Sequence, residues 1–238
     1  MEFPLFQVPY LGNGMTIGLV AVVHVIISHG LAIGVMSVIV LGEFLGFRQG
    51  SKEWDRFAKG LLKVTIIVIT GVGAPTGVGI WFTTSALSPR GLGSLLRVFF
   101  WPWFIEWLIF IIEVIVILVY YFTWDSWTGE RKKTHIYLGL SYLLAGLVSA
   151  FLITGILGFM LTPDGWPWDQ SFGSAFFNPS FIPQLFLRIG IAYTLGSLGA
   201  ATYLLWTRWQ EGFRQEALSL LGKISLGAIL VIPFLSWW

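Results

Sequence analysis

The sequence predicts an all-α fold, a polytopic membrane bundle of about six transmembrane helices. Hydrophobic residues make up 56% of the 238 residues and charged residues only 11%, with a mean hydropathy of +0.80. Soluble domains of this length do not have such a composition, whereas polytopic helical membrane proteins do. The apolar residues also fall into six separate stretches, each close to the ~20 residues that a spanning helix requires. We therefore expect one transmembrane domain over residues 1–238, in the inner (cytoplasmic) membrane.

The six stretches define the predicted helices in order along the chain. They cover residues 16–46, 60–84, 99–123, 135–161, 183–206 and 218–238. The first is longer than a bilayer requires, so we expect it to tilt or to extend beyond the bilayer. The second contains Pro75, which lacks a backbone donor and therefore predicts a kink that frees a carbonyl group.

The basic residues indicate how the bundle is oriented. The connections after the first, third and fifth helices carry eleven of the fourteen Lys and Arg residues. Because cytoplasmic loops are enriched in these residues, we expect these connections to be cytoplasmic and both chain termini to lie outside the cytoplasm. The eleven residues are Arg48, Lys52, Arg56, Lys59, Lys63, Arg131, Lys132, Lys133, Arg208, Arg214 and Lys223.

Three polar side chains fall inside apolar stretches at a similar predicted depth. His24, Glu106 and Arg188 lie roughly five to eight residues inside three different helices, counted from the expected outer face. Each is costly to place in hydrocarbon, so three at one depth favour a cofactor or charge-transfer site. For a single histidine, a hydrogen-bonded position in the core is the alternative interpretation.

Two further ionisable residues and a glycine extend this candidate site. Glu113 follows Glu106 by seven residues, so both carboxylates share one face of the helix. The two carboxylates could relay protons. Alternatively, one of them only hydrogen-bonds a neighbouring helix. His29 follows His24 by five residues, so the two cannot hold one metal from one face. Gly77 leaves room either for a flat group or for close helix packing.

Other parts of the chain are less informative about function. We expect Glu43 to pair with a basic residue of the loop after the first helix, and His135 to lie at the cytoplasmic surface. The absence of cysteine excludes disulfides, c-type haem attachment and thiolate metal sites on this chain. The formal net charge of +2 gives no indication of nucleic acid binding.

Several short motifs occur in a fixed order along the chain. They are His24 with the later Leu31-Ala32-Ile33-Gly34, Gly73-Ala74-Pro75-Thr76-Gly77, Ile105-Glu106 with Glu113, Trp124-Asp125, and Asn178-Pro179. In order and spacing they resemble the N-terminal half of cytochrome bd quinol oxidase subunit I. The resemblance covers about residues 15–207, and the predicted helix at about 218–238 is additional to it.

The chain departs from the family's pattern at several points. After Thr76-Gly77 it has Val78-Gly79-Ile80-Trp81-Phe82, where the family has a Glu-Phe-Gln-Phe-Gly run. Arg188 stands where the family has a histidine ligand of a low-spin haem, and the two glutamates are seven rather than eight residues apart. The family's later helices, with further haem ligands and the quinol-binding loop, have no counterpart here. The resemblance therefore does not imply a complete terminal oxidase.

What the resemblance implies is a smaller redox subunit. A haem b would have His24 as axial ligand of its iron, with Glu106 as the opposite ligand or a proton acceptor and Glu113 deeper on the same face. Arg188 would neutralise a haem propionate or Glu106, and Gly77 and His29 would line the same site. We expect the subunit to pass electrons between the quinone (quinol) pool and partner membrane or extracytoplasmic redox subunits, such as a c-type cytochrome or an iron–sulfur protein.

The sequence is also compatible with two other functions. One is a proton- or ion-conducting membrane subunit without haem, in which the two glutamates and His29 form the relay. The other is a structural membrane anchor that keeps the bundle but has lost its cofactor. Whether the chain is part of a quinol-oxidising enzyme complex depends on which of these is correct.

Overall fold

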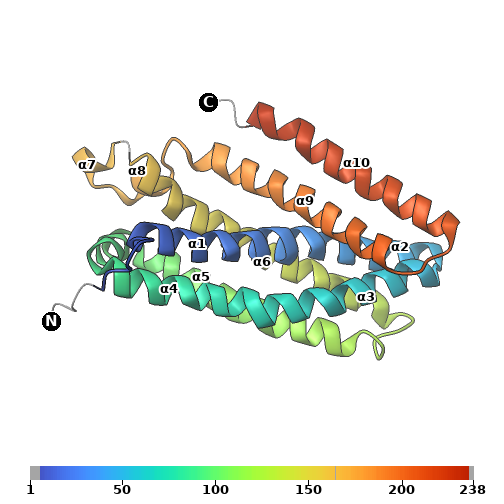
Figure 1. Cartoon of the computed structure of the whole chain (residues 1–238). Coiled ribbons are helices and arrows are strands. Elements are labelled where there is room, and N and C mark those ends of the chain that lie inside the picture. The colour runs from blue at the N-terminus through green and yellow to red at the C-terminus, as the bar shows by residue number, and fades with distance from the viewer. Residues whose placement is uncertain (1–5, 164, 236–238) are drawn as a thin grey trace.

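The computed structural model of the chain describes residues 6–163 and 165–235 and is built from helices. Six helical segments in these ranges are long and apolar enough to cross a membrane, which confirms the predicted number of spans. They run approximately along one axis and form an elongated bundle (Figure 1). The segments are Asn13–Gln49, Lys52–Leu87, Pro89–Thr123, Arg131–Leu161, Phe172–Trp206 and Glu211–Ile232.

Each of the first two spans is interrupted by a π-helical segment. The first comprises α1 (Asn13–Ile27), η1 (Ser28–Val35) and α2 (Met36–Gln49), and the second α3 (Lys52–Val68), η2 (Ile69–Gly73) and α4 (Ala74–Leu87). The segment η2 ends just before Pro75, and the backbone N–H of Ala74 donates to the Ile69 carbonyl, five residues back. The distortion predicted at Pro75 is therefore a wide π turn, which accommodates a residue without a backbone donor.

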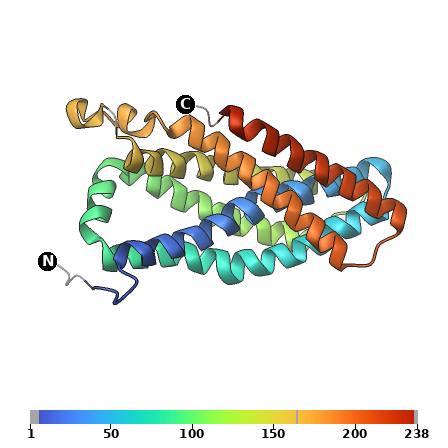
Figure 2. The same cartoon turned by 45° about the horizontal axis from the view of Figure 1, so that its top comes forward.

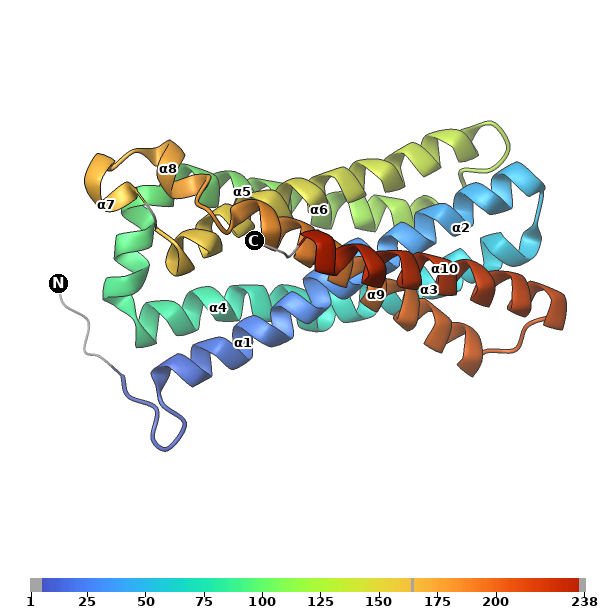
Figure 3. The ribbon, with the colours of Figure 1, turned by 90° about the horizontal axis from the view of Figure 1, so that it is seen from above.

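The remaining elements complete the bundle. They are α5 (Pro89–Thr123), α6 (Arg131–Leu161), the short α7 (Trp166–Asp169) and α8 (Phe172–Phe176), α9 (Phe181–Trp206) and α10 (Glu211–Leu235). In α5, Phe99 has non-helical backbone angles (φ −118°, ψ 25°). The residues before it run across the end of the bundle, and those after it run along the axis (Figure 3). The third helix thus begins at Pro89, ten residues before the predicted start at 99, and Phe99 marks a break inside it.

Two other helix starts differ from the prediction by more than five residues. The second span begins at Lys52 rather than at 60, because α3 starts as an amphipathic helix whose Trp54, Phe57 and Leu61 are buried. The hydroxyl of Ser51 caps this helix by accepting the backbone N–H of Trp54 at 3.4 Å. The last span begins at Glu211 rather than at 218, and its predicted end at 236–238 lies outside the described residues.

The packing of the helices divides the bundle into pairs. The helix α1 packs on α4, α5 on α6, and α10 covers α9 (Figures 1 and 2). In the middle of the bundle, η1 crosses α9 so closely that a Cβ atom on Gly34 would lie 2.9 Å from the Cα of Gly196. Small residues permit this approach, as is common between membrane helices.

The two ends of the bundle differ in composition. The connections after α2, α5 and α9, which carry most of the basic residues, meet at one end (right in Figure 1). A large apolar core lies around Ile39, Phe57 and Leu204. A smaller aromatic cluster around Phe99, Phe176 and Phe181 joins α5, α8 and α9. The predicted orientation, with the basic end in the cytoplasm, stays a prediction.

Candidate functional site

The imidazole of His24 lies against α4 and is fixed there by a backbone carbonyl. Its Nδ1 is 3.1 Å from the carbonyl oxygen of Gly73 and 3.4 Å from the hydroxyl of Thr76. Because a carbonyl oxygen can only accept a hydrogen bond, Nδ1 must carry a proton and donate. In a neutral ring this leaves the lone pair on Nε2, the arrangement found in metal-ligating histidines whose other nitrogen is held by a protein acceptor.

The space beside Gly77 is occupied by the same imidazole. A Cβ atom at Gly77 would lie 2.9 Å from Cε1 of His24, closer than real side chains approach each other. The absence of a side chain at Gly77 therefore lets the histidine ring lie against α4. A side chain at this position would push His24 away from the Gly73 carbonyl.

The second histidine faces a different neighbour. His29 lies in η1, which packs on α9. The residue is only 6% exposed, and its ring is close enough to Arg188 to interact electrostatically. Its Nδ1 is 3.1 Å from the hydroxyl of Ser28. Within the described ranges its buried Nε2 has no hydrogen-bond partner, which is unusual for a buried polar atom.

The two glutamates of α5 both face α6. The carboxylate of Glu106 accepts a hydrogen bond of 3.1 Å from the hydroxyl of Ser149. Deeper in the helix, Glu113 lies over Gly146, where an added Cβ would be 3.2 Å from its Oε1. The two carboxylates are close enough to interact electrostatically, so they form a line along the α5–α6 contact.

The candidate residues thus fall into three neighbouring groups. His24 with Gly77 lies between α1 and α4, His29 with Arg188 between η1 and α9, and the glutamates between α5 and α6. No contact recorded for the described residues joins His24 directly to Glu106. Figure 3 shows that the pair α1 and α4 diverges from the pair α5 and α6 toward the end where α1 begins.

A buried polar cluster at the basic end differs from what the sequence predicts. The expectation that His135 lies at the surface was wrong, since both His135 and Glu43 are 0% exposed. Nδ1 of His135 contacts the Glu43 carboxylate, and its Nε2 lies 2.8 Å from the backbone oxygen of Tyr120. Because both ring nitrogens have partners, His135 is not available as a ligand.

The partner of Glu43 also differs from the expectation. Its carboxylate pairs with Lys132 of α6 at 2.8 Å, not with the loop after α2, and accepts the hydroxyl of Tyr120 at 2.5 Å. Lys132 also reaches Asp55 at 2.8 Å. The spacing of Lys132 and His135 places both on one face of a helix, but their partner lies about 90 residues away in the chain, a pairing that single-sequence spacing does not reveal.

The chain is similar to known proteins over nearly its whole length. The family model of cytochrome bd terminal oxidase subunit I matches residues 15–237, a range that includes α10. A putative cytochrome bd menaquinol oxidase subunit I of Bacillus subtilis (strain 168) is 25% identical over 222 residues, which cover 87% of this chain and 48% of that protein.

A solved structure supports the fold independently of close sequence similarity. The bd oxidase from Geobacillus thermodenitrificans matches with a TM-score of 0.80 at 23% identity, over 94% of this chain and 53% of that chain. The chain therefore spans about half the length of the proteins that it matches. Members of this family are proteins of the cytoplasmic membrane that bind haems and quinol. Since the match covers almost every residue, the chain belongs to the cytochrome bd terminal oxidase subunit I family.

Proposed function

We propose that this chain is a haem-b-binding membrane subunit of a respiratory electron-transfer complex. It would pass electrons between the quinone pool and a partner redox subunit. The observation that carries the proposal is the position of His24, whose Nδ1 is held by the Gly73 carbonyl so that Nε2 is left for iron. A haem bound there would supply one-electron transfer within the membrane.

Arg188 supports the binding of an anionic group between η1 and α9. It is a half-buried cation in an apolar helix, and among residues 6–163 and 165–235 it has no ion pair. An intramembrane cation of this kind is costly unless an anion or water compensates it. A cofactor carboxylate would be such an anion, and Arg188 is suited to bind it through two hydrogen bonds.

His29 is the second group that we assign to cofactor binding. A buried polar atom without a partner costs about 1–3 kcal/mol, so its Nε2 is either satisfied by a bound group or destabilises the bundle. His29 lies in η1, which packs on α9, the helix that carries Arg188, and the two side chains are close enough to interact electrostatically. We therefore assign His29 a position beside the cofactor. His24 keeps the role of axial ligand.

The glutamates of α5 would take up the protons released when quinol is oxidised. Glu106 is the first acceptor in this assignment, because its carboxylate is held by Ser149 on the neighbouring helix. Glu113 continues the line along the same helix pair. Carboxylates inside a membrane that face a helix contact rather than lipid commonly carry protons.

Electron transfer through a haem requires a donor and an acceptor. The chain would therefore work with other membrane or extracytoplasmic redox subunits. A c-type cytochrome or an iron–sulfur protein would accept or donate the electron, and the quinone pool would be the other redox partner.

The test is the haem content of the complex purified with its native partners. We expect His24→Ala to lose one haem b per chain, measured as the pyridine haemochrome per mole of protein, while the protein remains in the membrane. Val22→Ala, at a 57% exposed position on the same helix, is the matched control and should keep the haem. Equal haem content in wild type and His24→Ala would refute the proposal.

Glu113 favours one alternative, a proton-conducting subunit without haem. In the described part of the chain its carboxylate has no hydrogen-bond partner, although it lies at a helix contact. This alternative predicts proton flux into liposomes that Glu113→Gln suppresses, in protein that carries no haem. A purely structural anchor would show neither effect.

A further inference from the structure

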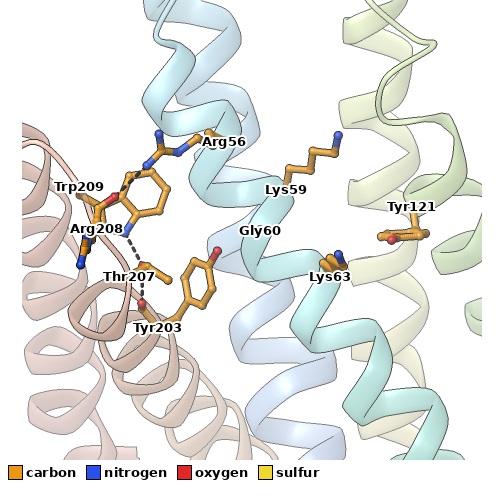
Figure 4. Close-up of a pocket in the computed structure, with 9 residues that line it drawn as sticks. All are labelled: Arg56, Lys59, Gly60, Lys63, Tyr121, Tyr203, Thr207, Arg208 and Trp209. Carbon is orange, nitrogen blue, oxygen red and sulfur yellow. Dashed lines mark hydrogen bonds between the residues drawn. The ribbon is translucent and has the colours of Figure 1, made fainter.

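A basic pocket lies at the end of the bundle where the connections after α2, α5 and α9 meet. It has a volume of about 340 Å³ and lies in front of α3, between the end of α9 and α5 (Figure 4). Four of its nine lining residues are Lys or Arg, none is acidic, and the others include two tyrosines and a tryptophan. The lining residues are Arg56, Lys59, Gly60, Lys63, Tyr121, Tyr203, Thr207, Arg208 and Trp209.

Three of the four basic side chains have no anionic partner. Lys59 is neutralised by Asp125, whose carboxylate oxygens are 2.6 Å from its ammonium group. Arg56, Lys63 and Arg208 make no ion pair with any residue that the structure describes. The lining therefore keeps an excess of positive charge and donors for an external anion.

The shape of the pocket is fixed by groups that do not need to move. The guanidinium of Arg56 donates to the Arg208 backbone oxygen at 2.9 Å and lies 4.2 Å from the centre of the Trp209 ring. Thr207 accepts the indole N–H of Trp209 and itself donates to the Tyr203 backbone oxygen at 2.6 Å. A preorganised set of donors binds an anion more tightly than mobile side chains do, because less ordering is required.

Gly60 forms the floor of the pocket. The hydroxyl of Tyr203 points toward α3 at this glycine, and a Cβ atom there would collide with it (Figure 4). Within the described residues the Tyr203 hydroxyl has no hydrogen-bond partner of its own. It is therefore an additional donor next to the basic side chains, in a hollow that only a residue without a side chain leaves open.

The apolar surface below the pocket indicates which kind of anion it binds. On the same face of α3 as Gly60, Val64 and Ile67 follow at helical spacing and are 46% and 62% exposed. Tyrosine and tryptophan at the rim are typical of the membrane–water interface. A ligand with a charged head group and apolar tails fits a basic pocket that adjoins an apolar helix face. The head group would lie in the pocket, and the tails would continue along α3 into the membrane.

We propose that the pocket binds the phosphate ester of an anionic phospholipid in the leaflet at the basic end. Arg and Lys bind phosphate oxygens through charge-assisted hydrogen bonds, and the tyrosine hydroxyl adds a neutral donor. If the basic end is cytoplasmic, as the distribution of Lys and Arg predicts, this is the leaflet where basic residues next to a span bind anionic lipids. The bound lipid would hold the end of α9 against α3.

The test compares lipids and soluble phosphate on the full chain, purified with its partners and placed in nanodiscs. Binding of phosphatidylglycerol, phosphatidylcholine and glycerol phosphate is measured by native mass spectrometry on wild type and on Arg56→Gln/Lys63→Gln. Loss of two basic residues at a membrane surface is expected to weaken phosphatidylglycerol binding about thirtyfold. Haem content is measured in parallel and is expected to stay unchanged, so this proposal can fail separately from the haem assignment.

The matched control removes the same charge elsewhere at the same end. Arg131→Gln/Lys133→Gln changes two exposed basic residues outside the pocket and should retain selective phosphatidylglycerol binding. Tyr203→Phe, which preserves the ring and all charges, is expected to weaken binding about tenfold if the hydroxyl donates to phosphate. This variant keeps the proposal testable if the double variant does not fold.

Four results would overturn the proposal. The control variant could lose phosphatidylglycerol to the same extent, which would indicate general surface charge rather than a site. Phosphatidylcholine could bind as tightly as phosphatidylglycerol, or Tyr203→Phe could leave binding unchanged. Glycerol phosphate binding as tightly as the lipid would show that a soluble phosphate, and not a membrane lipid, is the ligand.

Discussion

At the scale of single residues, His24 is positioned by two residues of the second span, one at the end of η2 and one in α4. The Gly73 carbonyl orients its Nδ1, and Gly77 leaves the space in which its ring lies. The sequence indicates that His24 and Gly77 belong to one region, but it does not reveal that the glycine contacts the histidine itself. That contact depends on how α1 packs on α4, which residue spacing within one helix cannot give.

The contact between Gly77 and the His24 ring gives the first prediction. Gly77→Ala should displace the imidazole, because the new Cβ would lie 2.9 Å from its Cε1, and should lower the haem content of the purified complex. Gly79→Ala is the matched control, since a Cβ there would be at an ordinary distance of 3.4 Å from Val20. Haem content that falls equally in both variants, or in neither, would contradict the role assigned to Gly77.

The buried cluster around Glu43 gives a second prediction at the same scale. Glu43→Gln should destabilise the protein by about 3–5 kcal/mol, because it leaves the buried Lys132 and His135 without their anion. The measurement is the midpoint of thermal unfolding in detergent.

Lys59→Gln is the control for this second prediction. It breaks a salt bridge to Asp125 whose two side chains are 43% and 79% exposed, so the expected cost is only about 0–1 kcal/mol. A Glu43→Gln variant as stable as Lys59→Gln would show that the cluster does not stabilise the fold.

At the scale of elements, the sequence predicts the number and approximate positions of the spans better than the residues at which the helices begin. Six apolar stretches are sufficient to predict six spans, because a bilayer requires a fixed length of apolar helix. The start of α3 was missed because its charged residues lower the hydropathy, although its apolar face is buried. The helical segment before Phe99 was missed because it runs across the end of the bundle.

The crossing of η1 and α9 gives the third prediction. Gly196→Ala should separate these elements, because its Cβ would collide with the backbone of Gly34, and should lower stability by about 1–3 kcal/mol. At Gly199, one turn further on, a Cβ would lie 3.5 Å from Val35, so Gly199→Ala serves as the control. Equal unfolding midpoints for the two variants would mean that the helices do not meet as described.

At the scale of the whole molecule, the two ends of the bundle have different chemistry. Basic connections and the phosphate-binding pocket lie at one end, and the aromatic cluster around Phe99 and Phe176 at the other. The family and the fold could be predicted from short motifs in a fixed order. The buried pairs and the basic pocket could not, because each is formed by residues from helices far apart in the chain.

The orientation of the bundle is the fourth prediction. Because eleven of the fourteen Lys and Arg residues are in the connections at one end, that end should be cytoplasmic. A fluorescent protein inserted at Gly129, between α5 and α6, should fluoresce in the cytoplasm, and a phosphatase inserted at Gly165 should be active outside it. The reverse pattern would invert the topology and place the pocket in the opposite leaflet.

The central claim is that His24 is the axial ligand of a haem b, and the most direct measurement is chemical rescue of His24→Gly. Imidazole added to this variant can take the place of the missing side chain beside Gly73 and Gly77. If His24 ligates the haem iron, the Soret band of the purified complex is weakened or shifted by His24→Gly and restored by imidazole. A Soret band that is unchanged by the substitution would contradict this ligation.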